Sequence, residues 1–304
     1  MHVTTRRQFL QSIPVAVAAG SALFAGRTAS ATPFGLPIGL QLYSVRELLP
    51  HDFDGTLNQV AALGYTEVEA AGYFGRSAAE VARSFRAAGL RCPSAHYSYF
   101  DLAAGFDKLL AFNHDVGVET IICSFPGFKN PERLKDRTMR TVLTSFTVDD
   151  WLWNAEQFNA MGAKAKAAGM RFGYHNHTME FHADGGMMPF DALVEHTDPG
   201  LVTFELDCGW VMVGGGDPVA YLERYANRIS MLHVKDFKKT AKPGSILEPP
   251  PAAELGTGSI DYHPIFAAAR KAHLTHIFVE QEAFNLPPMQ SLKMDIDYLK
   301  AFPA

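Results

Sequence analysis

The feature that most constrains the fold of this chain is a regular alternation of short apolar runs with longer amphipathic segments, repeated eight times. The apolar runs are continuous rather than interrupted at every second residue, which is typical of parallel strands buried on both faces. The segments between them have the period of amphipathic helices. Eight strand–helix units within 304 residues predict a single (β/α)8 barrel of the TIM type.

The expected strands are rich in apolar and β-branched residues. They cover residues 38–43, 65–70, 91–96, 118–124, 170–175, 201–206, 229–234 and 276–280. The expected helices cover residues 53–63, 77–88, 103–116, 148–168, 190–196, 218–225, 262–272 and 289–301. The competing architecture is a doubly wound open sheet, but no Gly-x-Gly-x-x-Gly motif follows the first strand.

The chain divides into a leader and one domain. Arg6 and Arg7 precede an alanine-rich apolar stretch, and Ala29-Ser30-Ala31 then resembles a cleavage site. We expect residues 1–31 to be a twin-arginine signal peptide and residues 32–304 to be an exported, periplasmic or otherwise extracytoplasmic barrel. The apolar stretch is too short and too weak to span a membrane, so we expect no membrane association after cleavage.

Composition excludes several classes of protein. The chain has 27 basic and 32 acidic residues and no run of Lys and Arg, which argues against nucleic acid as a partner. Cys92, Cys123 and Cys208 lie in or beside expected strands and form no Cys-x-x-Cys pair, so we expect buried free thiols. The sequence does not define an oligomeric state, and a homo-oligomer is compatible with it.

Polar residues gather where the expected strands end, and in a barrel the active site lies at the C-terminal ends of the strands. Any single one of these residues could instead be a solvated loop residue, but together they predict an active site. The set is Gln41, Tyr43, Glu67, Glu69, His96, Ser124, His175, His177, Asp207, His233, Lys235, Glu280 and Glu282.

Part of this set has the character of a metal site. His175 and His177 stand two residues apart, so they would face the same side of an extended strand. Asp207, His233 and Glu280 end three successive strands. Imidazole and carboxylate groups together are ligands for Mn²⁺, Co²⁺, Zn²⁺ or Fe²⁺. The sequence therefore predicts one divalent metal ion as the cofactor.

Several short motifs carry a resemblance to a known family. Residues 39–46 (GLQLYSVR), 174–177 (YHNH), 233–236 (HVKD), 255–261 (LGTGSID) and 278–281 (FVEQ) together resemble the sugar phosphate isomerase/epimerase family. That family belongs to the xylose isomerase-like TIM barrel superfamily. The resemblance extends over essentially the whole chain after the leader.

The resemblance implies a divalent metal held by a Glu, an Asp, a His and a second Glu from the last four strands. The last three ligands correspond to Asp207, His233 and Glu280. The chain departs from the family at the first ligand, because the usual Glu-Asn-His is His175-Asn176-His177 here. Either His175 replaces the glutamate, or Glu180 reaches back from the loop.

The first functional hypothesis is a metal-dependent sugar isomerase or epimerase that acts through an enediolate at a metal-chelated hydroxy-ketone. Glu280, with His177 or Glu180 on the opposite side, would move the proton. Lys235 would stabilise the oxyanion, although it could equally be an ion-pair partner of Asp236. The remaining candidate substrate-binding residues are Gln41, Tyr43, Glu69, His96 and Trp210.

The alternative keeps the site and changes the reaction. A lyase or hydrolase of 3-keto-glycosides, or an inosose-type dehydratase, would remove the same proton and then eliminate a neighbouring group. The missing first glutamate weakens epimerisation by two carboxylates, and export favours a substrate without phosphate. In either case the partner is a small sugar or keto-sugar. A sugar- or metal-binding protein without catalytic activity is the third possibility.

Overall fold

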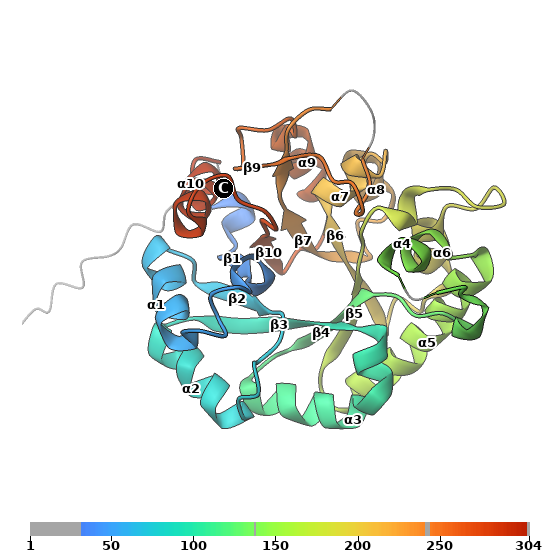
Figure 1. Cartoon of the computed structure of the whole chain (residues 1–304), viewed down its shortest axis with the longest axis horizontal. Helices are drawn as coiled ribbons and strands as arrows, with labels where there is room; N and C mark the ends of the chain where they lie inside the picture. The colour runs from blue at the N-terminus through green and yellow to red at the C-terminus, as the bar shows by residue number, and fades with distance from the viewer. Residues whose placement is uncertain (1–31, 137, 241–243, 303–304) are drawn as a thin grey trace, which may run out of the picture. The chain divides into compact units, whose positions relative to one another are not determined.

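The chain folds around a closed barrel of eight parallel strands (Figure 1). The computed structural model describes residues 32–136, 138–240 and 244–302. The order of strands around the barrel is β1-β10-β7-β6-β5-β4-β3-β2. This confirms the predicted TIM barrel, while the expected signal peptide at residues 1–31 lies outside the described residues.

The barrel strands are four to eight residues long. They are β1 Ile38–Gln41, β2 Glu67–Ala70, β3 Arg91–Ser98, β4 Thr120–Phe125, β5 Arg171–His175, β6 Val202–Asp207, β7 Ile229–Val234 and β10 His276–Val279. Two further short strands, β8 Asp236–Phe237 and β9 Ala252–Ala253, pair antiparallel outside the barrel.

Helices surround the barrel as an outer ring (Figure 1). The α-helices of the described residues, of which all but α4 belong to this ring, are α1 Phe53–Leu63, α2 Ala78–Ala88, α3 Tyr99–Val116, α4 Met139–Thr144, α5 Val148–Ala167, α6 Pro189–His196, α7 Cys208–Val213, α8 Pro218–Arg224, α9 Tyr262–Ala269 and α10 Pro288–Lys300. None of the helices in the described part of the chain is both long and apolar enough to cross a membrane.

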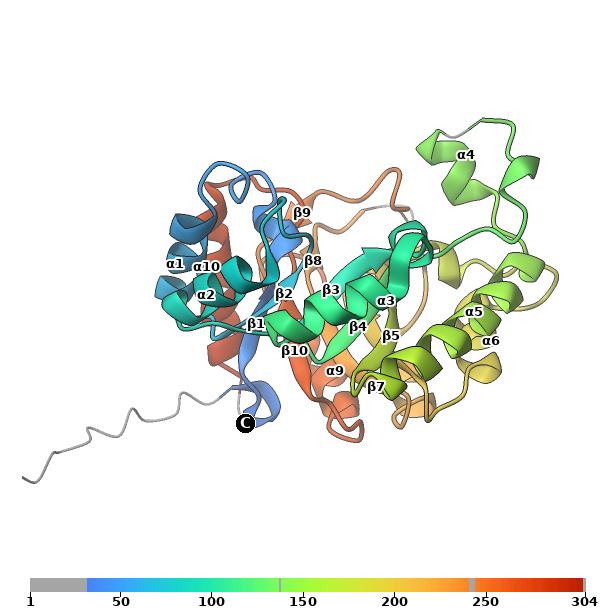
Figure 2. The same cartoon turned by 90° about the horizontal axis from the view of Figure 1, so that it is seen from below.

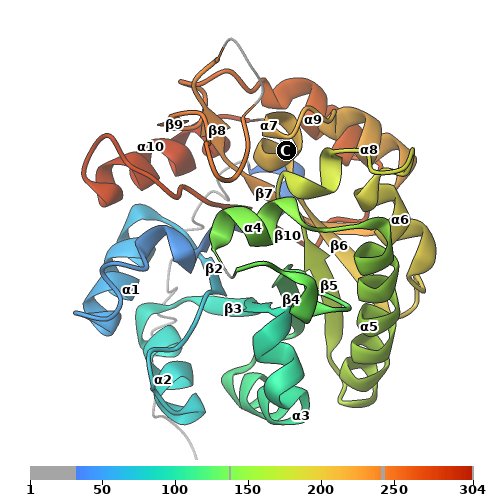
Figure 3. The same ribbon diagram turned by 45° about the vertical axis from the view of Figure 1, so that its right-hand side comes forward.

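Two of these helices were not expected from the sequence. The short α4 lies in the charged excursion between β4 and α5 and stands away from the ring at one end of the barrel (Figures 2 and 3). The short α7 begins directly after β6, where the Asp207 side chain accepts a hydrogen bond from Trp210 N at 2.7 Å and so caps the helix.

Local hydrogen bonds explain where two elements differ from the expected boundaries. β1 ends at Gln41 rather than at residue 43, because the Gln41 side chain accepts from Tyr43 N at 3.0 Å and turns the chain into a 3-10 helix. α3 begins at Tyr99, four residues before the expected start at residue 103. Ser98 and Asp101 form a capping box at that point.

The interior of the barrel has an apolar layer and a polar layer. Ile122, Met231 and Phe278 form a buried cluster separate from the main core between strands and helices. Gly39 makes room for it, since a Cβ atom there would lie 2.4 Å from the Phe278 ring. The polar side chains that follow further along β2, β3, β5, β6 and β7 lie above this apolar layer, at the C-terminal ends of the strands.

Asp236 fixes the loop between β9 and α9. Its buried carboxylate accepts five backbone N–H groups at 2.8–3.1 Å, from Phe237, Gly256, Gly258, Ser259 and Ile260. The loop approaches so closely that a Cβ atom at Gly258 would lie 2.1 Å from the Asp236 carboxylate. Its sequence therefore requires glycine at this position and an acid at residue 236.

We expect Asp236→Ala to lower the free energy of unfolding by about 3 kcal/mol, because five buried donors would lose a charged acceptor. Urea unfolding followed by far-UV circular dichroism measures the change. The control is Asp115→Ala, which removes an exposed carboxylate and should change stability by less than about 0.5 kcal/mol. Equal stability of the two variants would contradict the anchoring role.

Candidate metal centre

Four strand ends bring two carboxylates and two imidazoles together on the barrel axis. His175 ends β5, Asp207 ends β6, His233 lies in β7, and Glu280 directly follows β10. All four are buried, and one ligand atom of each lies within 4.8 Å of those of the others. The register of the sheet contributes to this, because it pairs Asp207 directly with His233.

The donor atoms have the separations and chemistry of a metal site. His175 Nε2 lies 3.9 Å and His233 Nδ1 3.8 Å from Asp207 Oδ2, and His233 Nδ1 lies 3.2 Å from Glu280 Oε2. Asp207 Oδ2 is buried and contacts the Lys235 ammonium group at 2.9 Å, while its Oδ1 caps α7. Two imidazole nitrogens and two carboxylates at these separations form a donor set that fits a divalent cation of the Zn²⁺, Co²⁺, Fe²⁺ or Mn²⁺ type.

Lys235 balances the negative charge beside this cluster. Its Nζ lies 2.9 Å from Asp207 Oδ2, 2.5 Å from Glu280 Oε2 and 2.8 Å from Glu282 Oε1. Burial acts to lower the pKa of Lys235, but the three carboxylates hold it well above its ordinary value. The alternative that Lys235 pairs with Asp236 is wrong, because the Asp236 carboxylate is directed at backbone N–H groups.

Glu180 lies away from the four-residue cluster. Its carboxylate accepts hydrogen bonds from the Tyr174 hydroxyl and, at 3.0 Å, from His177 N. Tyr174 points outward from β5 and stacks on Phe158 of α5, so this contact holds Glu180 on the outer side of the strand. Burial raises the pKa of Glu180 to about 7. Among the described residues, the four whose ligand atoms lie within 4.8 Å of one another include His175 and not Glu180.

A second group of buried polar residues lies directly beneath. His96 Nε2 lies 2.7 Å from Glu205 Oε2 and 2.9 Å from Glu69 Oε2, and both carboxylates are fully buried. Burial acts to lower the pKa of His96, but the two carboxylates raise it to about 9. Sequence reasoning missed Glu205. Its position two residues before Asp207 in the same strand would have predicted a side chain on the same face.

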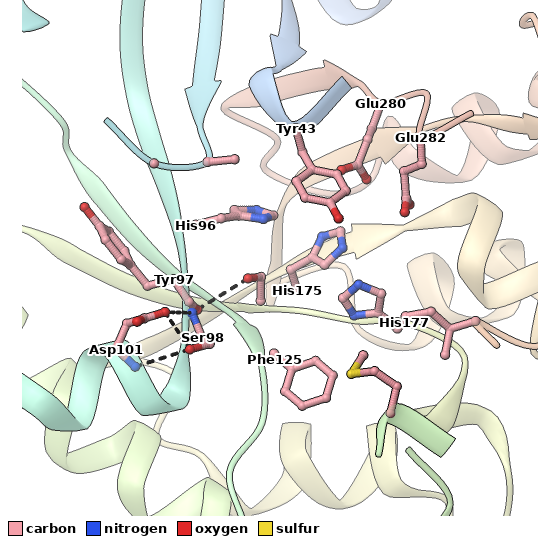
Figure 4. Close-up of a pocket in the computed structure, with 15 residues that line it drawn as sticks. Tyr43, His96, Tyr97, Ser98, Asp101, Phe125, His175, His177, Glu280 and Glu282 are labelled. Carbon is pink, nitrogen blue, oxygen red and sulfur yellow. Dashed lines mark hydrogen bonds between the residues drawn. The ribbon is translucent and has the colours of Figure 1, made fainter. Parts of the chain in front are cut away.

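A pocket of about 510 Å³ opens over the cluster (Figure 4). His175, His177 and Glu280 lie at its inner end, and Figure 4 shows Glu280 and His177 on either side of His175. His177 is neutral, because burial and the Lys235 charge lower its pKa to about 3, and its Nδ1 has no hydrogen-bond partner.

Two excursions border the mouth of the pocket. Met139 of α4 and Ile246 of the long loop between β8 and β9 both line it. Arg140 and Glu248 join the two excursions through an ion pair of 3.1 Å. The extra segments of this barrel thus form one side of the candidate site.

The five expected substrate-binding residues separate into two groups. Tyr43 and His96 line the pocket. Gln41 and Glu69 are fully buried and bond to each other at 2.7 Å, beneath the pocket rather than in its wall. Trp210 is also buried outside the wall, where its Nε1 donates to Glu282 Oε1 at 3.1 Å. These three side chains therefore do not line this pocket, although Trp210 lines a smaller adjoining one together with Glu280 and Glu282.

Comparison with known proteins places this site in a family. A family model described as xylose isomerase-like TIM barrel matches residues 57–302. Inosose dehydratase from Clostridium tetani is 26% identical over 236 residues, which cover 70% of this chain and 76% of the relative.

Solved structures agree with the family match. A sugar phosphate isomerase/epimerase from Parabacteroides distasonis superimposes with a TM-score of 0.71 and 26% identity, and covers 92% of this chain and 96% of its own. The IolI protein, solved with a bound zinc atom, has a TM-score of 0.64 at 11% identity over 86% of this chain and 96% of its own, and shares the fold.

The relatives and neighbours include inosose dehydratases and a sugar phosphate isomerase/epimerase, and this protein is an enzyme of the same superfamily. The match over residues 57–302 and the closed barrel with its strand-end cluster lead to one conclusion. The chain belongs to the xylose isomerase-like TIM barrel family.

Proposed function

We propose that the protein is a metal-dependent lyase of the dehydratase type that acts on an uncharged keto-sugar or keto-cyclitol. The enzyme would remove the proton next to the ketone and expel the group on the following carbon, which is water or an alcohol. Inosose dehydratase relatives at 24–26% identity support this reaction class. The proposal places elimination ahead of the isomerase or epimerase reaction expected first from the sequence.

One observation carries the preference for elimination: the two sides of the site carry different groups. Glu280 stands on one side, and the imidazole of His177 on the other (Figure 4). Epimerisation by two carboxylates needs an acid on each face of the substrate, but Glu180 is held by Tyr174 and His177 N. Elimination needs one base and one group that binds the departing oxygen, and Glu280 and His177 would supply these two groups.

The residues of the site would have three different roles in the reaction. A divalent ion held by His175, Asp207, His233 and Glu280 would polarise the ketone and make the adjacent C–H bond more acidic. Burial acts to raise the pKa of Glu280, but Lys235 and His233 hold it well below its ordinary value, so its carboxylate is charged and able to accept that proton. His177 would hydrogen-bond the oxygen that leaves, and the proton taken from carbon by Glu280 would be passed to that oxygen, so that water or an alcohol departs.

The charge of the pocket wall supports an uncharged substrate. Among the fifteen described residues that line it, none is Lys or Arg, whereas Asp101, Glu280 and Glu282 are acidic. Of the cations beside the pocket, the Lys235 ammonium group is engaged by three carboxylates, and the Arg46 guanidinium stacks on the Tyr43 ring and donates to Glu282 O at 3.1 Å. Proteins bind phosphate through Arg, Lys or helix N-termini, so this wall disfavours a phosphorylated sugar.

Isomerisation or epimerisation of the same substrate class remains the second candidate. The sugar phosphate isomerase/epimerase neighbour at 26% identity favours it. It would use the same ion and the same proton removal by Glu280, followed by return of a proton to carbon. The twin-arginine signal expected at residues 1–31 adds the proposal that the enzyme works outside the cytoplasm, where it would meet free glycosides.

The first prediction concerns metal content. We expect about one equivalent of Mn, Co, Zn or Fe per chain by mass spectrometry after reconstitution, and less than about 0.1 equivalent in Asp207→Ala, because one ligand is lost. Asp207→Asn is the sharper variant, since its amide oxygen can still cap α7 through Trp210 N while the second ligand oxygen is gone. Full metal content in both variants would contradict the assignment.

The second prediction separates the two reactions. With a methyl 3-keto-glucoside in D₂O, elimination breaks the C2–H and C1–O bonds, forms the C1=C2 bond and releases methanol, all visible by NMR. We expect methanol release, lowered about 10²–10⁴-fold in Glu280→Gln at saturating metal. Deuterium at C2 with the glycosidic bond intact would favour epimerisation instead. Unchanged turnover in Glu280→Gln would exclude this residue as the base.

The third prediction concerns substrate charge. We expect kcat/KM for a 3-keto-glucoside to exceed that for its 6-phosphate at least about 10-fold, because the acidic wall repels the phosphate and its described lining residues include no Lys or Arg. Lower ionic strength should widen the difference. A phosphorylated substrate turned over equally well at every ionic strength would contradict the proposal.

A further inference from the structure

Two carboxylates on the barrel axis, Glu69 and Glu205, have no role in the reaction outlined above. Both side chains are fully buried, one on β2 and the other on β6. Burial of an anion is expensive unless charged or hydrogen-bonding partners surround it. Glu69 accepts hydrogen bonds from Gln41 and Ser94, and the other partners of the two acids are three imidazoles, of which those of His175 and His233 belong to the metal cluster. Glu69 and Glu205 are therefore in direct contact with the histidines of the proposed metal centre.

His233 has different partners at its two ring nitrogens. Its Nε2 lies 2.6 Å from Glu69 Oε2 and 3.2 Å from Glu205 Oε2. Its Nδ1 faces the opposite way, toward Glu280 Oε2 at 3.2 Å and Asp207 Oδ2 at 3.8 Å. If Nδ1 binds an ion through its lone pair, the ring carries its single proton on Nε2, where the two carboxylates can accept it.

His175 repeats the arrangement with its nitrogens exchanged. Its Nδ1 lies 3.2 Å from Glu205 Oε2, and its Nε2 faces Asp207 Oδ2 at 3.9 Å. His96 completes the network beneath. Its ring stacks on that of His233 at a centroid distance of 5.2 Å, and its Nε2 bridges the two carboxylates.

We propose that Glu69 and Glu205 are positioning residues for the metal centre, which accept the outer N–H groups of His233 and His175 and so aim the other nitrogen of each ring at the ion. This inference rests on the metal centre of the proposed function but not on the reaction catalysed. A ligand histidine commonly donates its second N–H to such an acceptor, which fixes the tautomer and increases the ligand's basicity. Where the motif that the sequence resembles has a glutamate, this chain has His175. Its second ring N–H also requires an acceptor.

The same residues allow a rival assignment. His96, His175, Glu205 and His233 also have ligand atoms within 4.8 Å of one another, and Glu205 Oε1 is buried without a hydrogen-bond partner. The ion would then lie deeper, with Glu205 as a direct ligand. However, Glu205 Oε2 already lies 2.7 Å from His96 Nε2, a hydrogen-bond distance. In the cluster of His175, Asp207, His233 and Glu280, the histidine nitrogens lie 3.8–3.9 Å from Asp207 Oδ2, which leaves room for an ion between these atoms.

The experiment measures metal affinity in the full barrel without any substrate. Zn²⁺ dissociation constants are determined at pH 7 by competition with a chelating dye, for wild type, Glu205→Gln and Glu69→Gln. Absorption spectra of Co²⁺-loaded protein report the ligand set. The matched control is Glu67→Gln, because Glu67 is also buried in β2 and contacts a histidine, His276 Nδ1 at 2.8 Å, at the N-terminal end of the barrel.

We expect each of Glu205→Gln and Glu69→Gln to weaken Zn²⁺ binding about 10–100-fold with one ion still bound and the Co²⁺ bands retained. Glu67→Gln should bind as wild type does, even where its melting temperature falls equally. Three results would overturn the inference: wild-type affinity in both site variants, an equal loss in Glu67→Gln, or loss of stoichiometric binding and of the Co²⁺ bands in Glu205→Gln, which would make Glu205 a ligand.

The design also separates this inference from the proposed function. Wild-type protein that binds no Zn²⁺ or Co²⁺ would overturn both. Tight metal binding in wild type with unaffected variants would overturn the positioning role alone. Variants that bind weakly, in a protein that releases no methanol from keto-glycosides, would uphold the positioning role and leave the lyase proposal refuted. A variant that does not fold is replaced by Glu205→Asp, which keeps the charge and should restore part of the affinity.

Discussion

The structure depends on one constraint: a closed parallel barrel directs one side chain from nearly every strand end toward the same axis. Carboxylates and imidazoles placed there are removed from water and must be stabilised by one another. Glu69, Glu205 and His96 do so by hydrogen bonding, and Lys235 does so with three acids. Asp207 Oδ2 lies among His175 Nε2, His233 Nδ1 and the Lys235 ammonium group, and the two nitrogen lone pairs beside a carboxylate suit a divalent cation.

This arrangement gives the site an inner and an outer layer with different tasks. The inner carboxylates orient the rings of His175 and His233, and the outer groups face the pocket. His175 stands where the motif that the sequence resembles has a glutamate, and its second ring nitrogen lies 3.2 Å from Glu205 in the inner layer.

A buried carboxylate that accepts hydrogen bonds also holds a loop outside the barrel. Asp236, adjacent to Lys235 in the chain, is buried among five backbone donors rather than paired with its neighbour. Adjacent residues at a strand end point in opposite directions, so one serves the site and the other the loop. The excursions that carry Met139 and Ile246 border the pocket and meet through Arg140 and Glu248.

The sequence by itself determined the barrel, the order of its elements and the set of strand-end residues, because hydrophobic period and strand parity are local properties. It anticipated Asp207, His233 and Glu280 as a group for the same reason. Only the tertiary structure decided which way each side chain turns. A 3-10 turn after β5 brings Glu180 to Tyr174, and the sheet register brings Glu205 beneath two histidines from neighbouring strands. Such choices depend on partners that are distant in sequence, and no local pattern encodes them.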